Sequence, residues 1–219
     1  MNISTLFNHK KVVFSLEVFP PKKDTSYNVI YNTLLKLRGL PVDFISVTYG
    51  AGGSEAQREK TVEIASLILS TYHIEPVAHL TCVSLDRDDV IQTLAKLKEN
   101  NVLNVMALRG DITPTMNVKT DFKYASDLTA FIKETDPAFN VLGGCYPECH
   151  PECESLDQDI ENLKKKIDAG ASHLVSQLFF DNDTFYRFRD KAHAAGISIP
   201  IEAGIMPIIN KNQIERIVS

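Results

Sequence analysis

The chain has 219 residues, 44% of them hydrophobic, and carries 23 basic against 28 acidic side chains for a net charge of −5. This length and composition can supply one sizeable core. The charges are spread along the chain without a basic run, which argues against a nucleic-acid partner. No apolar run reaches the roughly 18 residues that a membrane span requires. Four cysteines and no recognisable secretory signal lead us to expect a cytoplasmic protein with reduced thiols.

Short segments rich in β-branched and aromatic residues predict strands. They recur about every 30 residues, which is the length of a βα unit. Their hydrophobicity is continuous rather than alternating, as in parallel strands that are buried on both faces. In chain order, we expect strands at residues 12–19, 44–49, 76–82, 103–109, 139–145, 173–179 and 201–206.

Amphipathic segments with helical spacing lie between the predicted strands. The apolar sets are Ile30, Leu34 and Leu37; Val90, Leu94 and Leu97; Ile160, Leu163 and Ile167; and Phe185, Phe188 and Ala192. Gly170 and Gly196 follow two of these segments, where helices commonly end. The sequence therefore predicts a regular alternation of strands and helices.

This alternation predicts the α/β class and a (β/α)8 TIM barrel. No Gly-x-Gly-x-x-Gly follows the first predicted strand, which disfavours a doubly wound dinucleotide-binding sheet. The sequence ends at "KNQIERIVS", inside the helix expected after the seventh strand. We therefore expect residues 1–219 to form a single catalytic barrel domain without its eighth unit. Two strand edges would then be open unless another segment fills the gap.

Polar residues occur at the carboxyl ends of the predicted strands, which is where TIM barrels hold their active sites. They are Glu17, Thr48, Tyr49, His79, Thr81, Arg109, Asp111, Tyr146, His150 and Gln177. We expect these side chains to converge on one mouth of the barrel.

Glu17 is the most informative of these residues because it lies within the apolar segment "FSLEVF". Burial raises a carboxyl pKa, and a raised pKa suits a general acid near neutral pH. The alternative is a structural glutamate that bonds to a neighbouring strand or pairs with an arginine. His79 could equally be a satisfied core histidine, Arg109 and Asp111 could pair with each other, and Gln177 could bond to the backbone.

The segment "GCYPECHPEC" has the residue types of a metal site. Its cysteines are Cys145, Cys149 and Cys153. Pro147 and Pro151 interrupt any continuous helix that would align the thiols. Structural zinc sites usually add a second ligand pair from elsewhere, and the remaining cysteine, Cys82, lies on another predicted strand. We therefore expect no metal, and we interpret the segment as a stiff loop that points Tyr146 and His150 at a ligand.

Motifs along the whole chain carry a family resemblance. In order, they are "LEVFPP", "VTYGAGG", "AHLTC", "ALRGD", "YPECHPE", "LKKKIDAGA", "SQLFFD" and "AGIMPI". The set resembles the 5,10-methylenetetrahydrofolate reductase family of the bacterial type. The resemblance implies an FAD-containing barrel in which NADH or NADPH reduces the flavin, and the flavin then reduces methylenetetrahydrofolate to 5-methyltetrahydrofolate in ping-pong order. It also implies a homo-oligomer that serves one-carbon metabolism and methionine biosynthesis.

The resemblance further implies roles for individual residues. Glu17 resembles the general acid that protonates the departing folate nitrogen, and Asp111 resembles a carboxylate that tunes the flavin potential. Substrate contacts are implied for Glu17, Thr48, Asp111, Gln177 and Gln213. FAD contacts are implied for Thr48, Tyr49, Ala51, His79, Arg109, Gly110, Asp111, Tyr124, Ala125, Tyr146, His150, Asp159, Asn162 and Lys166.

Several alternatives remain open from the sequence. Flavin contacts alone do not fix a substrate, so another flavin-dependent TIM-barrel oxidoreductase is the alternative enzyme. Outside the enzymes, the alternatives are a truncated, non-catalytic fragment that binds flavin or folate, and a zinc-binding module that uses the cysteine loop. For Lys166, within "KKK", the alternative is a solvated helix face.

Overall fold

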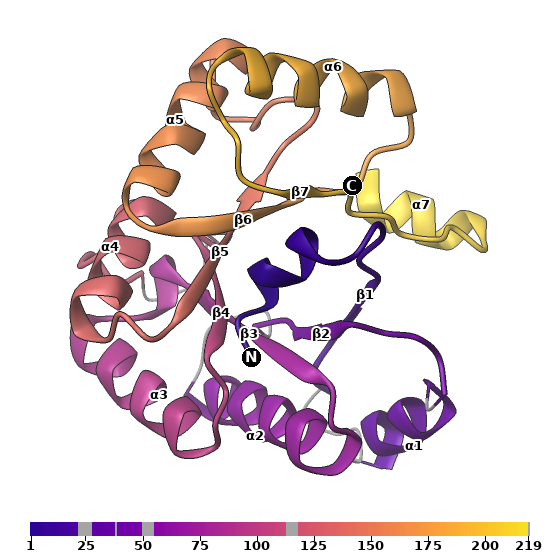
Figure 1. Cartoon of the computed structure of the whole chain (residues 1–219), viewed down its shortest axis with the longest axis vertical. Coiled ribbons are helices and arrows are strands. Elements are labelled where there is room, and N and C mark those ends of the chain that lie inside the picture. Colours follow the sequence, from indigo (N-terminus) through magenta and orange to yellow (C-terminus); the bar gives the residue numbers. More distant parts are fainter. Residues whose placement is uncertain (22–27, 38, 50–54, 113–117, 219) are drawn as a thin grey trace.

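The computed structural model describes residues 1–21, 28–37, 39–49, 55–112 and 118–218. Its strands form one sheet in sequence order, and every neighbouring pair is parallel. They are β1 (Ser15–Val18), β2 (Phe44–Val47), β3 (Glu75–Thr81), β4 (Asn104–Leu108), β5 (Asn140–Cys145), β6 (Ala171–Ser176) and β7 (Ile201–Glu202). The sheet curls into an open ring with helices on its outside (Figure 1). The predicted TIM-barrel architecture is confirmed, with seven strands in the described part of the chain.

The helices follow the predicted apolar sets. They are α1 (Asn28–Leu37), α2 (Glu55–Tyr72), α3 (Arg87–Glu99), α4 (Ala125–Thr135), α5 (Leu156–Asp168), α6 (Asn182–Ala194) and α7 (Lys211–Val218), with 3-10 helices η1 (Ile3–Asn8) and η2 (Cys82–Ser84). Gly170 and Gly196 end α5 and α6 with φ angles of 114° and 92°, as their positions predict. Among the described helices, none is long and apolar enough to cross a membrane.

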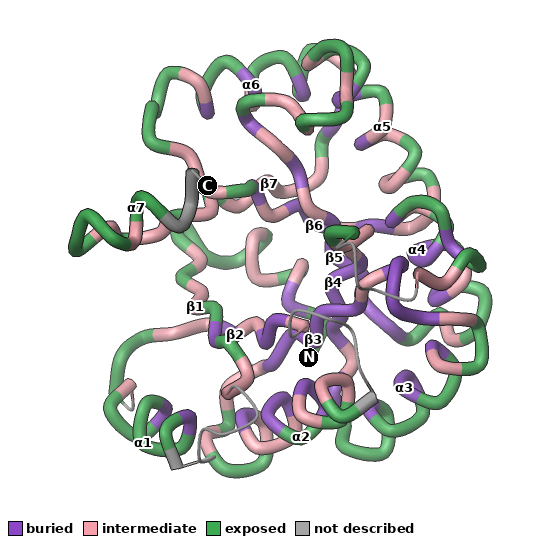
Figure 2. The backbone as a smooth tube through the Cα atoms, turned by 180° about the vertical axis from the view of Figure 1, so that it is seen from behind, coloured by how far each residue is buried: buried purple, intermediate pink, exposed green. Residues whose placement is uncertain are grey.

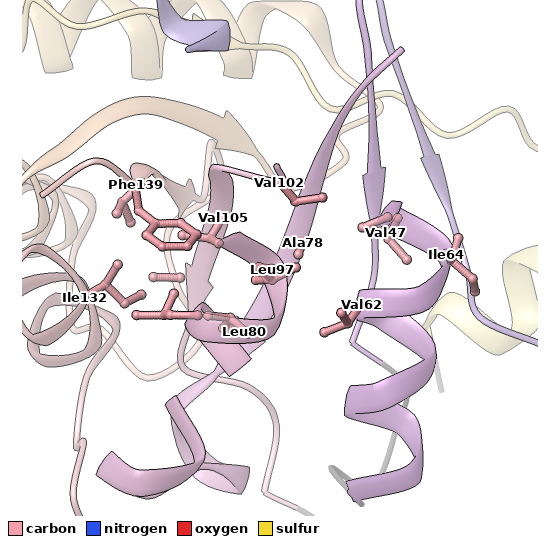
Figure 3. Close-up of a cluster of buried hydrophobic side chains, with 14 of the residues drawn as sticks. Val47, Val62, Ile64, Ala78, Leu80, Leu97, Val102, Val105, Ile132 and Phe139 are labelled. Carbon is pink, nitrogen blue, oxygen red and sulfur yellow. The ribbon is translucent and has the colours of Figure 1, made fainter. Parts of the chain in front are cut away.

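The largest core cluster lies between the sheet and the helices outside it. Figure 3 shows Leu97 of α3 and Ile132 of α4 beside Ala78, Leu80 and Val105 of the strands. Seen from behind, buried residues follow the strands and the inner faces of the helices (Figure 2). This burial on both faces explains why the strand segments are continuously hydrophobic.

The amino-terminal segment fills the bottom of the barrel. The indigo helix η1 lies inside the ring of strands (Figure 1), and Ile3 is fully buried against Phe44 and Met106. Asn104, the first residue of β4, accepts from the Ile3 N–H at 3.2 Å and donates to the Met1 carbonyl at 2.9 Å. The Met1 amino group pairs with Glu75 at 2.7 Å. The first predicted strand is shorter than expected, since β1 spans Ser15–Val18 rather than residues 12–19.

A side-chain bridge links the two outer strands, β1 and β7. Ser15 Oγ donates to Glu202 Oε1 at 2.5 Å, and Glu202 Oε2 lies 3.3 Å from Nε2 of the fully buried His173. Strand β7 pairs only with β6 and is two residues long, against the predicted span of 201–206. The inner side chains therefore hold together two edges that no backbone ladder joins within the described residues.

Candidate active site

Glu17, Ser46 and His79 meet near the carboxyl ends of β1, β2 and β3. The parallel register places Glu17 directly opposite Ser46. Ser46 Oγ donates to Glu17 Oε2 at 3.2 Å, and His79 Nε2 lies 3.6 Å from the same oxygen. The three strands therefore converge on one carboxyl oxygen.

Glu17 is less buried than its apolar surroundings predict. Its side chain is 47% exposed, and β1 is an outer strand of the sheet. The expectation of burial therefore holds only in part. Desolvation by the surrounding atoms nevertheless raises the pKa of Glu17, and the hydrogen bond from Ser46 partly opposes this rise.

His79 is a neutral imidazole at physiological pH. Its side chain is 6% exposed, and burial lowers its pKa to about 4. Its Nε2 atom has no hydrogen-bond partner among the described residues, so His79 is not the satisfied core histidine of the alternative interpretation. The pair with Glu17 is therefore a contact between a carboxyl and a neutral ring.

Unpartnered buried atoms gather at the predicted FAD contacts. Buried polar side-chain atoms in proteins are normally hydrogen-bonded. Seven such atoms lack a partner within the described residues, and four of them are Thr48 Oγ1, Tyr49 Oη, His79 Nε2 and Arg109 Nε. Burial raises the pKa of the Tyr49 hydroxyl, and Ser84, which donates to the Thr81 carbonyl at 3.1 Å, lies close enough to oppose part of this rise. Donors and acceptors of this kind fit a polar cofactor such as FAD.

Arg109 follows β4 and pairs with Glu152 rather than with Asp111. Both guanidinium Nη atoms contact the Glu152 carboxylate, one of them at 2.7 Å, and this hydrogen bond raises the Arg109 pKa. Gly110 has a φ of 84°, and a Cβ there would lie 2.8 Å from Val83 Cγ2. A left-handed turn that favours glycine therefore follows β4, and Asp111 directly after it is exposed.

The loop after β5 is built from turns, as its prolines predict. The Tyr146 and His150 rings meet edge-on at 4.7 Å, and the His150 N–H donates to Oδ2 of the buried Asp159 at 2.8 Å. The Glu152 N–H donates to His150 Nδ1 at 3.1 Å. In the neutral ring, the proton therefore lies on Nε2, which remains available as a donor. Three predicted FAD contacts thus lie together.

The cysteines of this loop do not form a metal cluster. No group of three or more His, Cys, Asp or Glu is placed to hold a metal within the described residues. Burial raises the pKa of Cys145 and Cys82 to about 12, so both are poor nucleophiles. The partly exposed Cys153 lies 3.8 Å from Asp159 Oδ1 and 3.6 Å from Asn162 Nδ2. Cys149 is also partly exposed, and desolvation raises the pKa of both thiols.

Lys166 differs from the other two lysines of its "KKK" run. Its Nζ donates to the Gly144 carbonyl at 2.7 Å, and burial lowers its pKa. Lys164 and Lys165 instead bond to side chains of their own helix. The solvated-face alternative was therefore wrong for Lys166, which lies against β5.

The remaining predicted residues form local contacts or lie at the start of α4. Gln177 is exposed, and its Oε1 accepts from the Leu178 N–H at 3.1 Å, which is the backbone bond of the alternative interpretation. The Gln213 amide bonds to Pro207 and Ile209 at 3.1 Å each, within the loop before α7. Tyr124 and Ala125 lie at the start of α4, exposed and buried respectively. Ala51 lies outside the described residues.

Sequence reasoning missed Ser46 and Glu152. The signal for Ser46 was its position on the predicted strand 44–49, two residues before Thr48, because alternate residues of a strand share a face. The signal for Glu152 was its place at the end of "YPECHPE". Neither contact could be derived from the chain alone, because both depend on strand register or loop geometry.

Polar chemistry at the carboxyl mouth of a parallel barrel is characteristic of TIM-barrel enzymes. A family model described as methylenetetrahydrofolate reductase matches residues 2–219. The chain therefore belongs to the methylenetetrahydrofolate reductase family, as its motifs predict.

Its relatives include bacterial and plant proteins. The 5,10-methylenetetrahydrofolate reductase of Pectobacterium carotovorum subsp. carotovorum is 36% identical over 206 residues, covering 94% of this chain and 67% of that protein. The reductase of the same name from Escherichia coli (strain K12) is 38% identical, covering 92% and 67%. Methylenetetrahydrofolate reductase (NADH) 1 of Arabidopsis thaliana is 35% identical, covering 95% and 37%.

Solved structures share the fold. An uncharacterized protein from Clostridium thermocellum that binds two copies of 5-methyl-5,6,7,8-tetrahydrofolic acid matches with a TM-score of 0.66 and 14% identity, over 98% of this chain and 72% of that one. Phosphoenolpyruvate phosphomutase from Streptomyces platensis subsp. rosaceus matches with a TM-score of 0.63 and 13% identity, over 92% and 71%. At these identities, the likeness is one of fold alone.

Proposed function

We propose that this protein reduces 5,10-methylenetetrahydrofolate to 5-methyltetrahydrofolate, with FAD as cofactor and NADH or NADPH as hydride donor. Family membership supports the folate reaction. The single observation that carries the proposal is the Glu17 carboxyl, whose pKa is raised by desolvation while its side chain stays about half exposed. A carboxyl that stays protonated nearer neutral pH can act as the acid that this reaction needs.

FAD would lie across the carboxyl ends of β2 to β5. The unpartnered atoms of Thr48, Tyr49, His79 and Arg109 support this placement. The other residues that would hold it are Gly110, Asp111, Tyr124, Ala125, Tyr146, His150, Asp159, Asn162 and Lys166, together with Ala51 outside the described residues. When bound, FAD supplies hydride transfer, first from NADH or NADPH and then to the folate, in ping-pong order.

Glu17 supplies the proton of the folate step. It protonates the nitrogen that leaves the one-carbon unit, and the electron pair of the broken C–N bond stays on that nitrogen. The carbon becomes an iminium on the remaining nitrogen and can accept the hydride. Glu17 is left as a carboxylate, and its half-exposed side chain can regain a proton from solvent. Gln177 and Gln213 are the further proposed substrate contacts, with Thr48 and Asp111.

Product analysis tests this function. The purified protein is incubated anaerobically with FAD, NADH and methylenetetrahydrofolate, and 5-methyltetrahydrofolate is quantified by chromatography, with each component omitted in turn. We expect product only in the complete mixture, or with NADPH replacing NADH. Oxidation of NADH without folate product would favour another flavin-dependent oxidoreductase instead.

A further inference from the structure

The hydroxyl of Ser46 has no part in the function described so far, although it contacts the proposed acid directly. Parallel register fixes this contact, because Glu17 and Ser46 are paired residues on neighbouring strands. Ser46 Oγ lies 3.2 Å from Glu17 Oε2 with donor geometry. The contact therefore depends on the backbone of two core strands rather than on a mobile loop.

The groups that face Glu17 leave Ser46 as its hydrogen-bond donor. On β3, His79 Nε2 lies 3.6 Å away, beyond hydrogen-bond range, and the ring is uncharged because burial lowers its pKa to about 4. On β1 itself, Ser15 is bonded to Glu202 of β7. Among the described residues, His79 is the only basic side chain within 4 Å of the Glu17 carboxyl. No lysine or arginine of the described residues therefore pairs with the carboxylate once its proton has left.

We propose that Ser46 is a positioning residue for the folate step, because its hydroxyl holds the Glu17 carboxyl in place and stabilises the anion formed when the proton is transferred. This inference rests on the proposed function. A hydroxyl that donates to a carboxylate favours the ionised form, whereas desolvation favours the protonated form. The two effects oppose each other at Glu17, as the direction of each contribution to its pKa indicates. Ser46 thus makes the acid stronger without adding a charge to the site.

The pH dependence separates this role from simple packing. A hydrogen bond to a carboxylate changes its ionisation equilibrium about tenfold. In Ser46→Ala, Glu17 is a weaker acid but stays protonated to higher pH. By Brønsted behaviour, about the square root of the tenfold change in acidity appears in the rate of proton transfer. At low pH, where Glu17 is protonated in both proteins, we expect the folate half-reaction of the variant to be about threefold slower than wild type. At high pH, its larger protonated fraction should make it about threefold faster. A packing defect would lower the rate by a similar factor at every pH.

The test uses two readouts on Ser46→Ala, on the conservative variant Ser46→Thr, and on Ser172→Ala. Ser172 is a matched control, since it is a barrel serine at the opposite end that bonds to Asn140. The first readout is the rate at which methylenetetrahydrofolate reoxidises the NADH-reduced protein, measured against pH. The second is ¹³C NMR titration of the Glu17 carboxyl carbon in the cofactor-free protein, assigned by its loss in Glu17→Gln.

In Ser46→Ala, we expect the Glu17 carboxyl to titrate at higher pH than in wild type. We also expect the ratio of variant to wild-type rate to be below one at low pH and above one at high pH. Ser46→Thr and Ser172→Ala should follow the wild type in both readouts. An unchanged Glu17 titration, or a rate ratio that does not vary with pH in an active protein, would overturn the role of Ser46 alone. A wild-type protein that reduces no folate would overturn the proposed function, and this role with it. The two failures are therefore distinguishable.

Discussion

Substitution of Glu17 by glutamine removes the proposed acid and little else. Glutamine has nearly the same shape, and its side-chain oxygen can still accept the Ser46 hydrogen bond, which is 3.2 Å long with glutamate. The side chain is 47% exposed, so we expect the free energy of unfolding to change by less than about 1 kcal/mol. Any large loss of activity would then reflect chemistry rather than folding.

The size of the loss follows from the role of the residue. A positioned general acid contributes roughly 10²–10⁴-fold to rate, and an amide cannot replace it. Glu17→Gln should therefore slow folate reduction by about 10²–10⁴-fold. Reduction of the flavin by NADH needs no proton from Glu17 and should change by less than about threefold. The wild-type folate step should also fall as pH rises through the raised pKa of Glu17, because only the protonated form donates.

Stopped-flow absorbance under anaerobic conditions measures the two half-reactions separately. Flavin bleaching reports its reduction by NADH, and recovery of colour reports transfer to methylenetetrahydrofolate. Equal losses in both steps would show that Glu17 is not a dedicated acid for the folate step. If the rate of the folate step still falls with rising pH in Glu17→Gln, that fall must come from the titration of another group.

Other predictions concern stability. Asn104→Ala removes the acceptor of the Ile3 N–H, a hydrogen bond of 3.2 Å, and leaves that N–H buried without a partner. We expect the free energy of unfolding, measured in urea, to fall by about 3 kcal/mol. Gly204→Ala places a Cβ 2.1 Å from the backbone carbonyl oxygen of Ser176 and should lower the free energy of unfolding by about 2 kcal/mol or more. Amide hydrogen exchange in β7 should also become faster. Asp86→Asn keeps a helix cap but loses the Lys119 ion pair. The hydrogen bond with Lys119, together with the one from the Asp89 N–H, lowers the Asp86 pKa to about 2. The stabilisation by the charged form therefore exists above about pH 4 and disappears as pH falls towards 2, so the urea midpoints of variant and wild type should converge in acid.

Each stability prediction has a matched control. Asn32→Ala changes an exposed asparagine of α1, and Ala203→Ser changes the exposed neighbour of the critical glycine. Asp88→Asn removes an exposed charge from the same helical turn as the Asp86 cap. We expect each control to stay within about 0.5 kcal/mol of wild type. If a control variant loses as much stability as the variant it is matched to, the contact assigned to that variant would be contradicted.

The architecture could be read from the sequence because periodicity is a local property. Val90, Leu94 and Leu97 define the inner face of α3, and all three are buried as predicted. The amino-terminal plug could not be read in the same way. Its anchor, Asn104, is an ordinary strand residue until the fold brings residues 1–8 beneath it, 101 positions away along the chain from Ile3. Long-range polar contacts of this kind have no periodic signal.

The same distinction applies to the site. Positions at strand ends identified Glu17 and His79, because parallel strands place their carboxyl ends together. The alternative in which Arg109 pairs with Asp111 was wrong, because the loop after β5 supplies Glu152 as the partner. The exposure of Glu17 was also misjudged, because an apolar run does not reveal that its strand is an outer one. Motif order indicated the family, but partners and exposure depend on the folded geometry.

The visible spectrum in one anaerobic double-mixing experiment tests the central claim most directly. The purified protein, loaded with FAD, is mixed first with NADH or NADPH and then with methylenetetrahydrofolate. Our account predicts that the flavin colour disappears in the first step and returns in the second, with one 5-methyltetrahydrofolate formed per flavin. A protein that bleaches but does not recover with folate would contradict the assigned substrate, and one that binds no FAD would contradict the proposed cofactor.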